Sequence, residues 1–114
     1  MRENDPMESS RQKLLSALGL CRKAGKLICG TPLICDALRS AQKPCAVIMA
    51  SDNSENTQKK LRDKCAFYEV ELLTPDLDGD ALSRAIGKSG RMSAVAVTDE
   101  NFYRLLQGAL EKKA

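Results

Sequence analysis

The feature that most constrains the fold of this chain is the regular alternation of short apolar runs with longer amphipathic segments. Two of these runs, residues 46–50 and 94–97, are continuous, as expected for interior strands covered on both faces. Two others, residues 27–29 and 70–73, are bounded by Gly or Pro and also predict strands. The remaining segments repeat apolar residues at helical spacing. The sequence therefore predicts an α/β fold, a three-layer α/β/α sandwich around a four-stranded mixed sheet.

The expected helices begin and end at residues that commonly stand at helix termini. Asp5 followed by Pro6 predicts the start of the first helix, which Gly25 ends. Thr31 is expected to cap the second helix, with Pro32 as its first helical residue. The apolar stripe that should bury this second helix consists of Leu33, Ile34, Ala37, Leu38 and Ala41.

The length and composition fit one compact domain. The chain has 114 residues, of which 43% are hydrophobic, so we expect a single domain over residues 1–114 with one core. Residues 1–8 are expected to form a loosely ordered N-terminal extension. No apolar run approaches the roughly 20 residues that span a bilayer, and the N-terminus lacks a hydrophobic signal region. We therefore expect a cytoplasmic protein without a membrane partner.

The residue types also limit the chemistry that the chain can perform. The absence of His removes the commonest general base and metal ligand. The five cysteines are an odd number and form no Cys-x-x-Cys pair, which disfavours both a disulfide framework and a zinc site. They are Cys21, Cys29, Cys35, Cys45 and Cys65, and we expect them to pack as small apolar groups. The sequence predicts no catalytic residue, metal, cofactor or small-molecule substrate.

Positive charge is concentrated in the first third of the chain, although the net charge is only +3. Residues 9–46 contain seven bases and one acid, Asp36, whereas the first eight residues carry −2 and residues 47–114 carry −1. The seven bases are Arg11, Lys13, Arg22, Lys23, Lys26, Arg39 and Lys43. This asymmetry predicts a basic patch for a polyanionic partner, with a merely solvated basic face as the alternative.

A second basic segment resembles a nucleotide-binding loop but does not meet its requirements. Gly87-Lys88-Ser89 matches the end of a P-loop, yet the upstream glycine position is Leu82. The segment also follows a helix and precedes a strand, which is the reverse of the P-loop order. What remains is a flexible loop, Gly87-Lys88-Ser89-Gly90-Arg91, with two cations and with two glycines that let a backbone approach closely. It could equally be only a solvated turn.

The junction between the first strand and the second helix is the other candidate site. Free N–H groups at a helix start, with Gly30 before them and Lys26 nearby, suit a phosphate or a base edge. A glycine before a helix is common and usually structural, so spacing alone is a weak signal for binding.

The ordered motifs across residues 14–110 resemble the ribosomal protein family that binds kink-turn RNA, the L-seven-Ae and L-thirty-e group, especially its short bacterial stand-alone members. The segments that carry the resemblance are Arg22-Lys23-Ala24-Gly25-Lys26-Leu27 with Gly30, Ala37-Leu38-Arg39-Ser40, Asn56-Thr57-Gln58-Lys59-Lys60, Lys64-Cys65, and Ala85-Ile86-Gly87-Lys88 before Ala94-Val95-Ala96-Val97. The resemblance implies an α/β/α sandwich that grips RNA between the glycine-containing junction and the loop before the last strand.

The chain departs from this family at three recognition positions. The resemblance places Asn, Glu and, one turn later, Lys where this sequence has Pro32, Leu33 and Asp36. Each lost hydrogen bond to a base edge removes roughly 1–3 kcal/mol of discrimination, and a carboxylate repels phosphate. These departures favour shape and backbone contact over base reading.

We therefore expect a non-catalytic protein that binds structured RNA, with kink-turn RNA and ribosomal RNA as candidate partners. The expected RNA-binding residues are Lys26, Gly30, Thr31, Pro32, Leu33, Arg39, Ile86, Gly87, Lys88, Ser89, Gly90 and Arg91. The alternative is a protein-interaction or dimerisation module on the same fold, with RNA reading lost through Pro32 and Asp36. An enzyme or nucleotide-binding domain ranks third.

Overall fold

The computed structural model describes residues 6–110, which form five helices and four strands in alternating order. The elements are α1 (Pro6–Lys23), β1 (Leu27–Cys29), α2 (Thr31–Arg39), β2 (Ala46–Met49), α3 (Glu55–Tyr68), β3 (Glu71–Leu73), α4 (Gly79–Ala85), β4 (Ala94–Val97) and α5 (Glu100–Leu110). The sheet order is β1-β4-β2-β3, with β2 parallel to β3 and with β4 antiparallel to both β1 and β2. The predicted four-stranded mixed sheet is confirmed.

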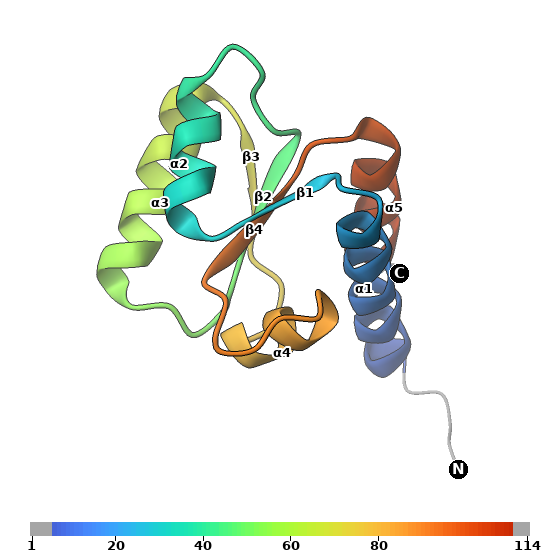
Figure 1. Cartoon of the computed structure of the whole chain (residues 1–114). Helices are drawn as coiled ribbons and strands as arrows, with labels where there is room; N and C mark the ends of the chain where they lie inside the picture. The colour runs from blue at the N-terminus through green and yellow to red at the C-terminus, as the bar shows by residue number, and fades with distance from the viewer. Residues whose placement is uncertain (1–5, 111–114) are drawn as a thin grey trace.

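Helices cover both faces of the sheet (Figure 1). Helices α1 and α5 pack side by side over one face, and α2 and α3 lie side by side over the other. Helix α4 lies near one end of the sheet and packs into the core on the α1 side. The predicted three-layer sandwich is therefore confirmed. No helix in the part of the chain that the structure describes has the length and apolar character needed to cross a membrane.

Side chains of β2 and β4 alternate between the two faces of the sheet. One set of side chains packs in the core on the α1, α4 and α5 side of the sheet: Ala46, Ile48, Val95 and Val97. The other set packs in the core on the α2 and α3 side: Val47, Met49, Ala94 and Ala96. All eight of these residues are buried. Because successive side chains of a strand point to opposite faces, burial on both faces requires a continuous apolar run. This explains why these two strands appear in the sequence as unbroken apolar segments.

The start of the second helix differs by one residue from the expectation. Gly30, rather than Thr31, occupies the N-cap position, and its carbonyl accepts the first helical bond from the amide of Ile34 at 3.1 Å. The φ angle of Gly30 is 97°, a conformation that side chains with a Cβ rarely adopt. The Thr31 hydroxyl instead pairs with that of Ser93 at 2.8 Å. The predicted cap at Thr31 is thus wrong, because the tight turn out of β1 requires glycine.

The buried face of α2 is also rotated relative to the prediction. Ile34, Cys35 and Leu38 are buried, whereas Leu33 is 59% exposed. Ala41 is exposed as well and lies beyond the end of the helix. Because the buried face differs from the predicted one, Leu33 faces solvent and is available to a partner.

Helix α1 contains Pro6, the expected first helical residue. Residues 6–8, which were assigned to a loosely ordered extension, belong to this helix. The proposed N-cap, Asp5, lies outside the described residues.

Two leucines on α2 provide a matched test of this packing. Leu38→Ala removes a fully buried side chain and should lower the free energy of unfolding by about 2–5 kcal/mol. Leu33→Ala removes an exposed one and should change it by less than about 0.5 kcal/mol. Urea denaturation measures both values. Equal losses for the two variants would contradict the observed orientation of α2.

Candidate functional site

The junction between β1 and α2 leaves backbone donors at the start of the helix without a side-chain cap. The N-cap residue Gly30 makes no side-chain hydrogen bond, and its own amide donates to the carbonyl of Ala94 at 3.0 Å. The exposed side chains of Pro32 and Leu33 follow in the first turn. The first-turn N–H groups of a helix carry partial positive charge and attract anions. This junction therefore combines an anion-attracting backbone with an apolar surface.

The loop between α4 and β4 is fixed at its start by paired hydrogen bonds. The amide of Lys88 donates to the carbonyl of Ser83 at 3.0 Å, and the Ser83 hydroxyl donates to the carbonyl of Lys88 at 2.6 Å. Gly87 has a φ angle of 73° and is exposed, as are Lys88, Ser89 and Gly90. The backbone of Lys88 is therefore fixed while its side chain faces solvent.

Ile86, which was expected to contact RNA, is buried. Only 5% of it is exposed, and it belongs to the core formed with α1 and α5. This corrects the expectation, because Ile86 anchors the loop from below instead of presenting a surface.

The junction and the loop meet at one hollow of about 370 Å³. We call it the β1 hollow, and it is lined by Arg22, Leu27, Ile28, Cys29, Leu33 and Lys88. The structure thus brings together two segments that are more than 50 residues apart in sequence, as expected. Cations from α1 and from the α4–β4 loop stand at the rim of an apolar floor made by β1 and Leu33.

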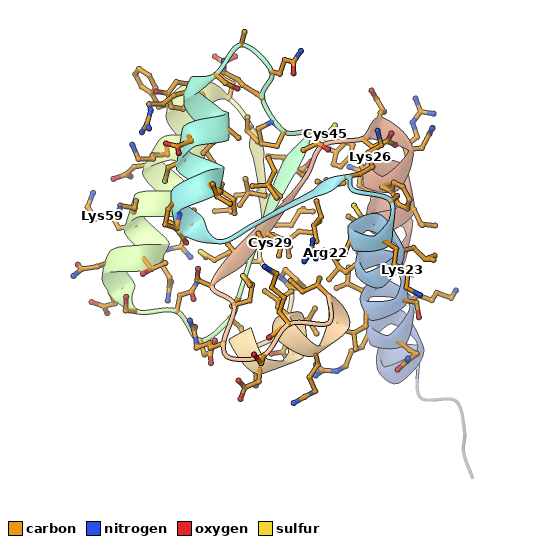
Figure 2. The ribbon with its side chains drawn as sticks, in the orientation of Figure 1. Arg22, Lys23, Lys26, Cys29, Cys45 and Lys59 are labelled. Carbon is orange, nitrogen blue, oxygen red and sulfur yellow. The ribbon has the colours of Figure 1, made fainter. Side chains whose placement is uncertain are left out.

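Arg22 belongs to this hollow, although the sequence did not single it out as a binding residue. Figure 2 shows Arg22 on the β1 side of α1 near Cys29, whereas Lys23 points away from the sheet. Arg22 follows the buried Leu18 by four residues and therefore stands beside the buried face of α1. Lys23 lies about 100° further round the helix. The four-residue spacing between Leu18 and Arg22 was the signal in the sequence that could have identified Arg22 as a site residue. It distinguishes Arg22 from Lys23, although the two cations are adjacent in sequence.

Lys26 lies outside the β1 hollow. It precedes β1, and its carbonyl accepts from the amide of Thr98 at 3.0 Å, at the end of β4 opposite the junction. Figure 2 shows Lys26 near the beginning of α5, at the end of the sheet where Cys45 also lies. Lys26 and Lys88, both expected among the RNA-binding residues, therefore do not border the same hollow.

Arg91 connects the loop to the start of α3. Its Nη2 donates to Asp52 Oδ1 and to Asn53 Oδ1, both at 2.7 Å. The side chain passes over Gly79, where a Cβ would overlap the Cγ of Arg91. Its hydrogen bond, with that from the amide of Gly79, holds the pKa of Asp52 below its ordinary value. Arg91 thus acts first as a tie between two loops.

Arg39 lies in a second depression, of about 760 Å³, between α2 and α3. We call this the α2–α3 groove, and it is lined by Thr31, Pro32, Cys35, Asp36, Arg39, Asn56, Thr57, Lys60, Lys64 and Ser93. Arg39 forms an ion pair with Asp36, so the acid that would repel phosphate is compensated. Lys60 and Lys64 were not predicted as site residues, because a helix with charge on several faces does not show which face borders a groove.

All five cysteines are free thiols, and Cys21, Cys35 and Cys65 are buried. Burial raises the pKa of Cys21 and of Cys65 to about 11, so both thiols are protonated at neutral pH. Within the described residues, no three His, Cys, Asp or Glu side chains are grouped to hold a metal ion.

The Arg91 contact makes a prediction about the titration of Asp52. In Arg91→Gln the pKa of Asp52 should rise towards the ordinary value of 3.8, because the strongest hydrogen bond to the carboxylate is lost. The tie stabilises the fold at neutral pH, and its contribution should disappear as the pH falls through the lowered pKa of Asp52. NMR titration of the carboxyl carbon measures the shift, with Arg84→Gln as a control. An unchanged pKa in Arg91→Gln would contradict the contact.

Comparison with known proteins assigns this chain to a family. Residues 12–107 match the model of the Ribosomal protein L7Ae/L30e/S12e/Gadd45 family. A protein of Enterococcus faecium named RNA-binding protein YlxQ is 35% identical over 105 residues, covering 91% of this chain and 97% of the relative. A Bacillus subtilis (strain 168) protein of the same name is 37% identical over 94 residues, covering 82% of this chain and 91% of the relative.

Comparison with solved structures gives the same fold. A Bacillus halodurans C protein with unknown function superposes with a TM-score of 0.78 at 34% identity, covering 87% of this chain and 97% of that one. The Giardia lamblia 15.5kD RNA binding protein shares the fold, with a TM-score of 0.71 at 14% identity, covering 94% of this chain and 87% of that one. The resemblance inferred from the sequence is confirmed: this chain belongs to the Ribosomal protein L7Ae/L30e/S12e/Gadd45 family.

Proposed function

We propose that this protein is a non-catalytic RNA-binding protein that contacts a structured RNA through the β1 hollow. The observation that carries the proposal is the meeting of Arg22 and Lys88, from distant parts of the sequence, around the exposed Leu33. Two relatives that cover most of the chain are named RNA-binding proteins, which supports the same function. The hollow offers cations for phosphates and an apolar surface for a base or sugar.

The electrostatics of the hollow support an anionic partner. Among the residues that the structure describes, neither Arg22 nor Lys88 forms an ion pair with a carboxylate. Both side chains are exposed, and the uncapped first turn of α2 lies next to them. Their positive charge is thus available to a partner, and the helix start adds to it.

We propose a kink-turn as the RNA, with ribosomal RNA as one source of it. A kink-turn offers two closely spaced phosphate backbones and a base turned out of the stack, which match the cationic rim and the apolar floor. Pro32 and Leu33 provide no side-chain hydrogen bonds to base edges, so recognition should depend on the shape of the kink. Of the other predicted contacts, Lys26 and Arg39 would act outside the hollow, on flanking RNA.

A three-RNA titration tests this target. Gel-shift measurements at two salt concentrations should compare a kink-turn RNA, an unkinked duplex and a random RNA. We expect binding to the kink-turn to be tightest and least reduced by salt, because shape-specific contacts add to phosphate contacts. Equal, salt-sensitive binding to all three would show a generic basic surface and refute kink-turn recognition.

Neighbouring cations on α1 provide a matched test of the hollow. The double variant Arg22→Gln, Lys88→Gln should weaken RNA binding and reduce the slope of log affinity against log salt by about 1.8, the value for two lost phosphate contacts. Lys23→Gln removes one positive charge next to Arg22 in sequence but on the outer side of α1, and it should leave the slope unchanged. Filter binding across a salt series measures both. A double variant with wild-type affinity would exclude the hollow as the RNA site.

A protein-interaction module is the second candidate, and one observation favours it. A hollow of about 560 Å³ lies between α1 and α5, next to Leu20 and Leu105, which are 54% and 49% exposed. Exposed apolar residues around a depression suit a protein contact. If none of the three RNAs is bound, light scattering with Leu20→Ser as the comparison would test self-association through this surface.

A further inference from the structure

The α2–α3 groove contains charged groups that the β1 hollow does not use, and an exposed aromatic side chain follows them on α3, beyond the lining of the groove. Lys60, Lys64 and Phe67 recur along α3 at positions i, i+4 and i+7, the spacing of one helical face. Lys60 and Lys64 line the groove. Phe67 continues the same face one turn further on and is 77% exposed, although large aromatic side chains usually lose much of their surface on folding.

The packing of α3 determines which way this face points. Leu61 and Cys65 are buried against the sheet, and Lys60 and Lys64 precede them by one residue, which turns them towards α2. Figure 2 shows Lys59 on the outer side of α3, where it forms an ion pair with Asp63 at 2.6 Å. The lysines of α3 are thus divided between a paired outer face and the groove.

The charges of the groove suit a polyanion. Its lining holds three cations, Arg39, Lys60 and Lys64, and one anion, Asp36, so its formal charge is +2. Asp36 is held by Arg39, and no ion pair engages Lys60 or Lys64 among the described residues. The two lysines are therefore free to contact successive phosphates.

An aromatic group with an exposed surface stands beyond these cations. The rings of Phe67 and Tyr68 meet edge to face, with centroids 4.8 Å apart and planes at 88°. Lys43 lies over the Tyr68 ring at 5.5 Å, so the inner ring is already covered while Phe67 remains open. An exposed ring beside cations is a surface on which an unpaired base can stack.

The groove begins where the β1 hollow ends. Thr31 and Pro32 line the groove, and the next residue, Leu33, lines the hollow, so only the first turn of α2 separates them. Figure 1 shows α2 and α3 running side by side in the same direction away from this point. The eleven-residue step from Asn56 to Phe67 corresponds to about 16 Å along α3, room for a few nucleotides.

We propose that the α2–α3 groove binds a single-stranded segment of RNA that continues from the structured part held at the β1 hollow. Lys60 and Lys64 contact its phosphates, and an unpaired base stacks on Phe67. A duplex would not supply this contact, because its bases are stacked on one another and their faces are closed. This inference rests on the proposed function and adds to it the kind of RNA that flanks the recognised structure.

Three RNAs isolate the groove from the hollow. One is a blunt kink-turn RNA, and the other two carry the same structure with an eight-nucleotide uridine tail on one end or on the other. Wild-type protein should bind one tailed RNA more tightly than the blunt RNA, and the tail should steepen the salt dependence. Filter binding at several salt concentrations provides both values.

Three variants separate the phosphate contacts from the base contact. Lys60→Gln, Lys64→Gln together should remove about 1.4 of the salt slope that the tail adds. Phe67→Ala should reduce binding of the tailed RNA by about 5- to 150-fold, and by much less when the tail is abasic. Arg62→Gln, on the opposite side of the buried face of α3, is the matched control and should behave as wild type. All variants should bind the blunt RNA normally, which also verifies folding.

The outcomes distinguish the two proposals. If wild type binds blunt and tailed RNAs equally, or if the variants weaken both alike, the groove inference is wrong while the proposed function stands. If the wild-type protein binds none of these RNAs, blunt or tailed, the proposed function fails and the inference fails with it. If the tail adds nothing and a glutamate-rich peptide binds in a Lys60- and Lys64-dependent way, the groove serves an acidic protein segment instead.

Discussion

The pairing of β4 with both β1 and β2 determines where every other part of this molecule lies. Antiparallel hydrogen bonding places residues 27–29 against residues 95–97, and the amide of Gly30 extends the ladder to the carbonyl of Ala94. The loop that precedes β4 is therefore held beside the helix that follows β1. Without this contact Leu33 and Lys88 would share no surface. The same strand also separates the two cores, since its residues alternate between them.

Two groups among the cations of the protein have different roles. Arg39, Arg91, Lys59 and Arg104 each lie within ion-pairing distance of a carboxylate. Exposed pairs of this kind contribute little to stability, but they fix the direction of a side chain and cancel its charge at short range. Arg22, Lys88, Lys60 and Lys64 have no such pair in the described residues and border the two depressions. A net charge of +3 thus understates the local potential that an anionic partner meets.

Sequence reasoning predicted the elements of the fold better than the site. Continuous apolar runs identified β2 and β4 because burial on both faces leaves no position for a polar residue. Strand order was not predictable, since it depends on contacts between distant segments. Ile86 was expected at the surface, but an amino-acid type alone does not say whether its side chain points into the core. Arg22 was missed because the charge pattern alone does not show which cation of α1 stands beside the buried face. The α2 cap lies at Gly30 because the turn out of β1 takes a positive φ angle there, which glycine readily adopts, and this outweighed the capping preference of Thr31.

The fastening of the α4–β4 loop at both ends has a consequence for the entropy of binding. Ser83 holds the backbone of Lys88, and Asp52 holds Arg91, so only Ser89 and Gly90 lie between two fixed points. A partner that engages this loop has little backbone freedom to remove, and the ordering of one lysine side chain is the main entropic loss. The loop is in this sense preorganised: its short length and its two attachments fix its backbone when the protein folds, before any partner arrives.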